Sequence, residues 1–211
     1  MFKTKDKIKF PINEFCGFFL ELPYKKSKLS CCDMGLISYY DLRSNNHYIL
    51  DEQEPVMSCL LSLEGSLTLV FRGEAEFDFI PQVFGLGYLW NEGNHDLVTR
   101  LNEGQNLVEN EKDLVSSYQV WSSSLHNYST WLYTNNKKIY FEVTPDYPWH
   151  YIEPKLSDPF ISYEEFMKTY RPLVLEEISR TVAEQWLVKT QELLEIIHKN
   201  SFLHEPLVDA K

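Results

Sequence analysis

The sequence has no hydrophobic run that approaches the roughly 18 residues of a membrane-spanning helix, and no repeat or low-complexity segment divides it. Basic residues are scarce: 20 lysines and arginines stand against 31 aspartates and glutamates, which gives the 211-residue chain a formal net charge of −11. Such a charge repels the phosphate backbone of a nucleic acid. We therefore expect neither a membrane partner nor a nucleic-acid partner.

Cysteine is limited to four residues, and no Cys-x-x-Cys pair indicates a zinc site. Cys31 and Cys32 are adjacent, which makes a disulfide between them awkward. The basic N-terminus does not lead into an apolar stretch long enough for a secretion signal. These features predict a cytoplasmic protein with reduced, mostly buried thiols at Cys16, Cys31, Cys32 and Cys59.

Acidic residues are unevenly spread along the chain. The first 30 residues carry a net charge of +4 and the remaining 181 a net charge of −15. An acidic field attracts cationic partners and speeds their capture, although excess acid also simply keeps a protein dispersed. Glu74, Glu76 and Asp78 alternate with apolar residues, so a strand here would present a carboxylate about every 7 Å. This row suits a basic partner, and it equally suits protection of a sheet edge against aggregation.

Two segments near the N-terminus, 14–22 and 35–42, are rich in aromatic and branched residues and are predicted to be strands. Farther along, 128–134 and 137–144 flank the pair Asn135–Asn136. Because asparagine tolerates positive φ, these segments predict a hairpin with a tight turn. Large apolar residues recur at every second position in both segments, so one face of the hairpin is expected to pack on a core.

The stretch between these pairs is interpreted as a β-meander. Segment 56–71 is predicted to be a hairpin that turns at Glu64 and Gly65, because apolar residues alternate after the turn. Segment 74–79 is predicted to be the third strand, ended by Pro81, which cannot donate to a strand ladder.

The last third of the chain changes to helical spacing. Ser162 and Glu165 have the spacing of a capping box, which predicts a short helix, and Pro172 is expected to end that helix and open the next. Thr181 and Glu184 repeat the capping spacing ahead of a long amphipathic helix. The apolar stripe of that helix comprises Val182, Ala183, Trp186, Leu187, Leu193, Leu194 and Ile197.

Strands first and helices last predict an α+β fold, in which C-terminal helices pack against a mainly antiparallel sheet. We expect one domain over residues 1–211, strand-rich over 14–144 and helical over 162–199. In the polar stretch before the second hairpin, segments 96–101 and 106–115 are expected to be short helices or strand ends.

No motif in the sequence names a reaction. Ser66 lacks the flanking residues of a nucleophile elbow, and the glycines Gly85 and Gly87 precede large rings rather than the lysine of a phosphate-binding loop. The six histidines show no spacing that places two imidazoles on one metal, so each is expected to be solitary. The sequence therefore predicts no catalytic residue, no cofactor and no metal site.

Aromatic residues make up 15% of the chain, and most are expected in the core. The rings of the 145–154 loop are different, because prolines restrict the backbone there. Large rings on a stiff loop make good interface anchors, and a cap over the sheet edge is the alternative interpretation. Together with the acidic row, they form the predicted partner-binding set: Glu74, Glu76, Asp78, Tyr147, Trp149 and Tyr151.

The stretch KIYFEVTPDYPW at 138–149, followed by ISYEEF at 161–166 and the helix over 181–197, resembles small bacterial proteins of uncharacterised function. Some of these are immunity proteins of polymorphic toxin systems. The similarity covers residues 128–198 and consists of a hairpin, a Pro-aromatic loop and a capped helix. It implies an acidic, aromatic-rich cytoplasmic protein without catalysis, whose task is to sit over the active site or fold of a toxin.

The leading hypothesis is a noncatalytic acidic binding protein of the immunity or antitoxin type, which neutralises a basic toxin domain by direct binding. The alternative is a hydrolase or other small enzyme whose pocket contains His150, Glu153 and Asp146. A homodimer that uses the same exposed rings is the third hypothesis. A concave pocket that gathers imidazoles and carboxylates within hydrogen-bonding reach would favour the enzyme.

Overall fold

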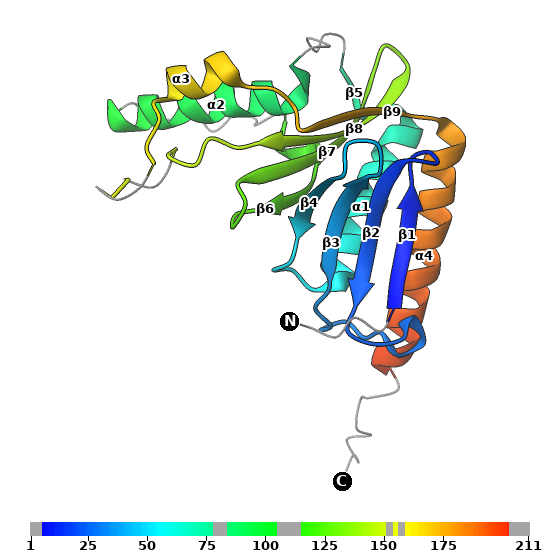
Figure 1. Ribbon diagram of the computed structural model, residues 1–211. Coiled ribbons are helices and arrows are strands. Elements are labelled where there is room, and N and C mark those ends of the chain that lie inside the picture. Colours follow the sequence, from blue (N-terminus) through cyan, green and yellow to red (C-terminus); the bar gives the residue numbers. More distant parts are fainter. Residues whose placement is uncertain (1–5, 78–83, 105–114, 151–153, 156–158, 203–211) are drawn as a thin grey trace.

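The computed structural model describes residues 6–77, 84–104, 115–150, 154–155 and 159–202. In these ranges the chain forms two β-sheets and four α-helices, and the fold is α+β, as the sequence predicts. Figure 1 shows the four-stranded sheet and α4 at one end, and α2 and α3 at the other.

The first sheet is antiparallel, with its strands in chain order. Its members are β1 (Asp6–Pro11), β2 (Cys16–Leu22), β3 (Leu36–Asp41) and β4 (Asn46–Asp51). The 3-10 turn η1 (Lys26–Lys28) lies between β2 and β3. The strands predicted at 14–22 and 35–42 are thus confirmed as β2 and β3.

The second sheet is mixed, and a hairpin forms its centre. This hairpin consists of β7 (Tyr128–Asn135) and β8 (Lys138–Pro145), as predicted. The turn is shifted by one residue, because Asn136 and Lys137 adopt the positive φ while Asn135 pairs with Lys138. The other strands are β5 (Glu76–Phe77), which is parallel to β7, and β6 (Gln119–Ser123) and β9 (Val174–Ile178), which are antiparallel to β7 and β8 respectively. The turn η2 (Ser116–Tyr118) precedes β6.

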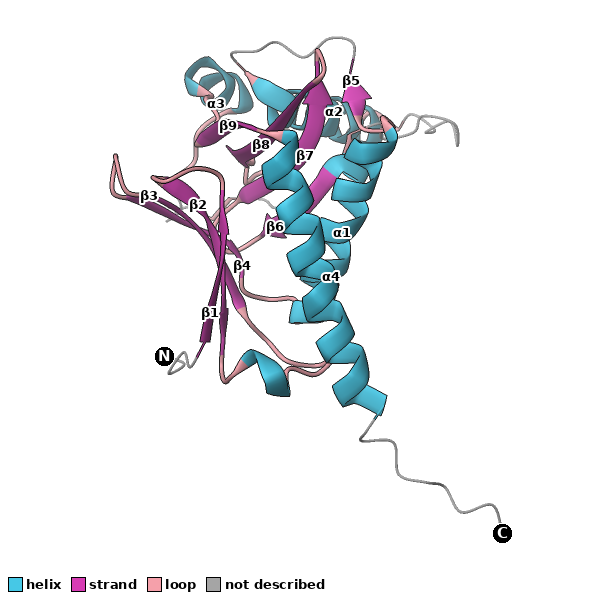
Figure 2. Cartoon of the chain, turned by 90° about the vertical axis from the view of Figure 1, so that its right-hand side faces the viewer, coloured by secondary structure: helices cyan, strands magenta, loops and turns pink. Residues whose placement is uncertain are grey.

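The α-helices fall into two pairs. Figure 2 shows α1 (Val56–Arg72) and α4 (Arg180–Phe202) side by side, with the first sheet along one side of them. The helices α2 (Gly85–Asn102) and α3 (Tyr163–Thr169) lie beyond the second sheet at the other end of the molecule.

One aromatic ring joins the sheets and helices into a common core. Phe18 of β2 is fully buried, and its ring meets four others at centroid distances of 4.6–5.7 Å. Those rings are Phe10 of β1, Trp121 of β6, Phe141 of β8 and Trp186 of α4. Each such pair adds about 0.5–1.5 kcal/mol beyond the burial of apolar area. The two sheets therefore share a single hydrophobic core.

The hairpin predicted at 56–71 is wrong, because this segment is the helix α1. Its buried apolar residues include Val56, Cys59, Leu63, Leu67 and Val70, which recur at intervals of three and four, and Leu60 lies beside them. That period places them on one helix face, which packs against α4 and β6. The alternation of Leu67, Leu69 and Phe71 is typical of a strand, but it covers only the end of the segment. Over the whole segment the buried residues follow the helical period, and the segment is a helix.

The predicted third strand of the meander is also corrected. Of the described residues of this segment, only Glu76 and Phe77 form a strand, and they pair in parallel with the end of β7 at Thr134 and Asn135. Asp78 and Pro81 lie outside the described residues. A parallel partner from a distant segment leaves no period in the local sequence, which explains the error.

In the polar stretch, 96–101 belongs to the helix α2. Most of 106–115 lies outside the described residues.

In the last third, the capping box of Ser162 and Glu165 is confirmed at the start of α3. Pro172 does not open a helix, since β9 follows it. The cap of α4 is also different from the prediction: the Ser179 hydroxyl accepts the bond from the Val182 amide at 3.2 Å. The apolar stripe on α4 is confirmed, with Ala183, Trp186, Leu193, Leu194 and Ile197 buried.

The helical state of α1 leads to a prediction about two glycines. Gly65 lies in the middle of α1 and Gly73 adopts φ 71° at its C-cap, and a Cβ at either position meets open space. We expect Gly65→Ala to raise the free energy of unfolding by about 0.5–1 kcal/mol. Gly73→Ala is expected to lower it by about 1–2 kcal/mol, because a side chain disfavours the left-handed backbone. Urea unfolding measures both; a destabilised Gly65→Ala variant would contradict the helix and favour a turn.

Candidate functional site

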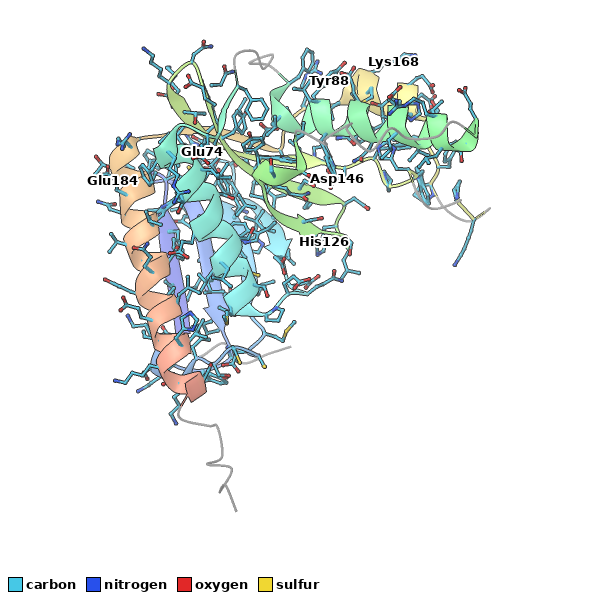
Figure 3. The ribbon with its side chains drawn as sticks, turned by 180° about the vertical axis from the view of Figure 1, so that it is seen from behind. Glu74, Tyr88, His126, Asp146, Lys168 and Glu184 are labelled. Atoms are coloured by element: carbon cyan, nitrogen blue, oxygen red, sulfur yellow. The ribbon has the colours of Figure 1, made fainter. Side chains whose placement is uncertain are left out.

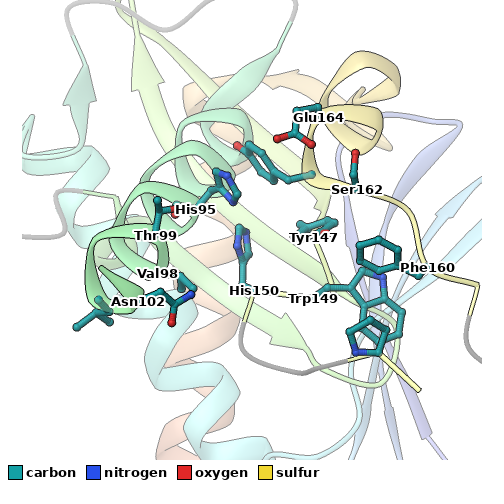
Figure 4. A pocket seen from close by; sticks show the side chains of 13 residues that line it. His95, Val98, Thr99, Asn102, Tyr147, Trp149, His150, Phe160, Ser162 and Glu164 are labelled. Atoms are coloured by element: carbon teal, nitrogen blue, oxygen red, sulfur yellow. Dashed lines mark hydrogen bonds between the residues drawn. The ribbon is translucent and has the colours of Figure 1, made fainter. Parts of the chain in front are cut away.

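A cleft of about 640 Å³ opens between α2, the loop after β8 and the start of α3 (Figure 4). From α2 it is lined by His95, Val98, Thr99, Leu101 and Asn102; from the loop by Tyr147, Trp149, His150 and Pro154; and from the α3 region by Phe160, Ser162, Tyr163 and Glu164. Its walls combine aromatic rings with a few polar groups, which is typical of a binding site.

A buried carboxylate holds α2 in the position that forms this cleft. Glu142 of β8 is fully buried and accepts hydrogen bonds from the backbone amides of Leu86 at 2.8 Å and Gly87 at 2.9 Å. The Tyr133 hydroxyl donates a third bond at 2.6 Å. The first amides of a helix lack partners within the helix and carry its positive end. The carboxyl group therefore satisfies the start of α2, and these three bonds partly oppose the rise that burial causes in its pKa.

The glycines of the 85–87 segment permit this close approach. A Cβ at Gly85 would overlap the Glu142 carboxyl group, and a Cβ at Gly87 would overlap the Thr144 side chain. Gly85 also adopts φ 68°. The two glycines thus serve helix docking, and the amides that a phosphate would need are bonded to a carboxylate of the protein itself.

The side chain of Asn91 connects α2 to the loop after β8. It is fully buried and donates to the carbonyls of Gly87 and Pro145, at 2.8 and 3.1 Å. Its oxygen accepts the bond from the Tyr147 amide at 2.8 Å. The Tyr147 hydroxyl in turn donates to the Ile161 carbonyl at 3.0 Å, which fixes the loop to the residues just before α3.

Two histidines meet in the cleft. The ring centroids of His95 and His150 are 6.0 Å apart, and His95 stacks on Tyr163 at 3.6 Å. The prediction of six solitary histidines is therefore wrong for this pair, which comes together from α2 and the loop. Burial, and then the charge of His95, lower the pKa of His150 to about 4, so His150 is neutral at pH 7.

Asp146, a predicted member of the enzyme pocket, does not line the cleft. Its carboxyl group accepts a bond from the Ser129 hydroxyl at 2.5 Å, and Figure 3 shows the residue below α2. Desolvation raises the pKa of Asp146 to about 7, while the Ser129 bond opposes that rise. Glu153 lies outside the described residues. Of the three groups predicted for a catalytic pocket, only His150 is seen in the cleft.

The predicted acidic row lies far from the cleft. Glu74 and Glu76 are exposed, and Glu76 pairs with Thr134 at one end of β7. The loop that carries Tyr147 follows Pro145, which pairs with Tyr128 at the other end of β7. The two ends are about 20 Å apart along the strand. Figure 3 likewise shows Glu74 and Asp146 in separate parts of the molecule.

The predicted aromatic residues of the 145–154 loop lie in different environments in the structure. Tyr147 is buried against Tyr163 and Phe166 of α3, so its ring packs on a helix. Trp149 is partly exposed and lines the cleft, and the centroid of its ring lies 6.2 Å from that of Phe160. Tyr151 lies outside the described residues.

Several residues of the cleft carry no sequence signal that singles them out. Leu101, Phe160 and Ile161 are 48%, 53% and 41% exposed, which is unusual for such large apolar side chains. Leu101 and Phe160 line the cleft itself, and Ile161 sits beside it between Phe160 and Ser162. The cleft is therefore bordered by apolar side chains that meet solvent.

Within the described residues, no three His, Cys, Asp or Glu side chains are grouped closely enough to hold a metal ion. The same part of the chain contains no helix with the length and apolar character to cross a bilayer. All four cysteines are free; Cys16 and Cys59 are buried, whereas Cys31 and Cys32 are exposed, contrary to the expectation of mostly buried thiols.

The fold and site define an α+β protein with an aromatic cleft at one end. Comparison of the chain with protein-family models, with curated proteins and with solved structures gives no significant match.

The role of Glu142 is tested by Glu142→Gln. The amide offers one acceptor oxygen where two backbone amides and a phenol need partners, so we expect the free energy of unfolding to fall by about 2 kcal/mol. Glu177→Gln is the matched control: Glu177 forms an exposed ion pair with Lys138, and its loss should cost less than about 0.5 kcal/mol. Hydrogen exchange should also become faster in the first turn of α2. Equal stability of the two variants would disprove the docking role.

The displaced pKa values predict how stability depends on pH. Burial raises the pKa of Glu142 and of Asp146 to about 7, so the folded protein keeps two protons that the unfolded chain releases between about pH 4 and 7. Their contribution is present below pH 4 and is lost as the pH rises to 7. His150 acts in the opposite direction, because its pKa of about 4 leaves it neutral where the unfolded chain binds a proton.

At these three groups the folded protein therefore binds at most about one proton more than the unfolded chain. As the pH rises from 4.5 to 7, the free energy of unfolding should fall by at most about 1.4 kcal/mol per pH unit. Asp146→Asn removes one of the two carboxyl groups. In this variant the free energy of unfolding should therefore fall less steeply as the pH rises. Urea unfolding of both proteins at several pH values measures the difference. Parallel curves for the two proteins would contradict the prediction.

Proposed function

We propose that the protein is a noncatalytic binding protein of the immunity type, which holds a basic protein partner in the cleft between α2 and α3. The observation that carries this proposal is the border of exposed apolar side chains around a cleft with aromatic walls. Exposed rings in a concave site are the usual anchors of a protein interface. An immunity protein neutralises a toxin by binding to it directly, so the proposed partner is a toxin.

Charge supports a cationic partner. None of the described residues that line the cleft is Lys or Arg, and Glu164 supplies a carboxylate. Burial keeps His150 neutral, so it does not repel a cation. The whole chain carries a net charge of −11. Arg or Lys side chains stack favourably on aromatic rings when a carboxylate is near.

The rigidity of the cleft also favours binding. Asn91 and Glu142 bond α2 to the end of β8 and to the sheet, and Tyr147 bonds the loop to the residues before α3, which lowers the entropy lost on association. The buried carboxyl group of Glu142 is occupied by partners within the fold, so it serves stability rather than chemistry on a ligand. Asp146 accepts the Ser129 bond and does not line the cleft.

An enzymatic function is the second candidate, and the pair His95 and His150 favours it. A neutral imidazole can accept a proton, and its pKa of about 4 makes His150 a weak base near pH 7. The nearest carboxylate in the described lining is Glu164, which is exposed at the start of α3. Chemical change of the partner or of a small molecule by the purified protein would establish this alternative.

The proposal is tested by protection from a toxin. The product of the gene adjacent to that of this protein is the candidate toxin, expressed in a bacterial host with and without the protein. We expect the protein to restore growth and Trp149→Ala combined with Phe160→Ala to abolish the protection, with affinity weakened by about thirtyfold or more. Surface plasmon resonance measures the affinity directly.

Phe15→Ala is the matched control, because Phe15 is an exposed ring in the turn between β1 and β2. It should leave affinity unchanged. Glu164→Gln should mainly slow association and weaken its salt dependence. If the double variant binds like the unchanged protein, the cleft is not the docking surface. If the toxin is cleaved or modified, the noncatalytic function is wrong.

A further inference from the structure

A pair of exposed thiols lies outside the cleft and the core. Cys31 and Cys32 are in the loop between η1 and β3, which Figure 1 shows beside the C-terminal end of α4, far from α2 and α3. Their Sγ atoms are 3.5 Å apart. Adjacent side chains on a strand point to opposite faces, so the approach of these two sulfurs is a property of the turn.

Hydrogen bonds define the turn on both sides of the pair. The Asp33 carboxylate accepts bonds from the Ser30 amide and hydroxyl, and the Asp33 amide donates to the Ser30 carbonyl at 3.3 Å. The two cysteines are thus the central residues of a four-residue turn. The turn is tied to α1, because the Val56 amide donates to the Asp33 carbonyl at 2.8 Å.

The segment before the turn is fixed to α4. Asn200 donates to the carbonyls of Ser27 and Leu29, at 3.1 and 2.8 Å, and Leu29 is fully buried. The Ser201 hydroxyl and the Cys32 thiol, both beside Cys31, lower the pKa of the Cys31 thiol, whereas Cys31 raises the pKa of the Cys32 thiol. The site thus combines two accessible sulfurs with a backbone that is already ordered.

The geometry points to a bidentate dithiol site for trivalent arsenic bearing one organic group. Thiolates prefer soft thiophilic centres. Zinc would need about four protein ligands at a structural site, and no third His, Cys, Asp or Glu within the described residues joins these two. An organoarsenic(III) centre needs only two sulfurs, because it brings its own carbon ligand. It requires both sulfurs on one side, as the turn provides.

The reaction is a substitution without a change of oxidation state. An organoarsenic oxide, R–As=O, reacts with the two thiols so that two As–S bonds form and the bonds to oxygen break. Both thiol protons leave with that oxygen as one water molecule. No oxidant or reductant takes part.

The test uses phenylarsine oxide with the full-length protein, reduced by a phosphine. We expect one phenylarsenic group per chain by intact mass, the loss of two titratable thiols, and release by ethanedithiol but not by mercaptoethanol. Cys31→Ser and Cys32→Ser should each weaken binding by about a hundredfold, because the second thiolate acts at a high effective concentration. Peptide mapping should place the arsenic on Cys31 and Cys32.

Cys16→Ala is the matched control, since Cys16 is buried, and it should bind as the unchanged protein does. Asp33→Ala tests whether the turn presets the pair: we expect about tenfold weaker binding with both thiols still titratable. Retention of full affinity in either serine variant would overturn the site. Full affinity in the folded Asp33→Ala variant would show that the Asp33 turn does not preorganise the two thiols. These results do not depend on toxin binding.

Discussion

The bond between a buried carboxylate and the start of a helix is the interaction on which the site depends. Glu142 lies on the sheet face that α2 covers, where an ionised group is costly unless donors surround it. The amides of α2 and the Tyr133 hydroxyl are those donors. This requirement fixes where the helix begins and needs glycine at 85 and 87. The later turns of α2 then face the loop after β8, and the cleft lies between them.

The groups that stabilise the fold are separate from the groups that line the cleft. The carboxyl groups of Glu142 and Asp146 are bonded within the structure. The cleft instead presents imidazoles, aromatic rings and the carboxylate of Glu164. Such a lining suits recognition by shape and positive charge, and that is the physical basis of the proposed binding function.

The main core joins the two sheets to α1 and α4, whereas separate clusters pack α2 and α3. Phe18 brings together rings from the first sheet, the second sheet and α4, so these elements share the same packed interior. The cleft lies beyond the second sheet, whereas the Cys31–Cys32 turn is attached to the ends of α1 and α4. The two sites therefore have separate supports, and a ligand at one need not disturb the other.

Local patterns in the sequence determined the β7–β8 hairpin, the capping box of α3 and the apolar stripe of α4, because each depends on neighbours within a few residues. The same local view misread α1 as a hairpin, since a short alternation hid the helical period. Only the tertiary structure decided that Glu142 is buried under α2 and that His95 meets His150 across 55 residues. The carboxyl group of Glu142 and the rings in the cleft find their partners through packing between distant segments, and no spacing along the chain records such an encounter.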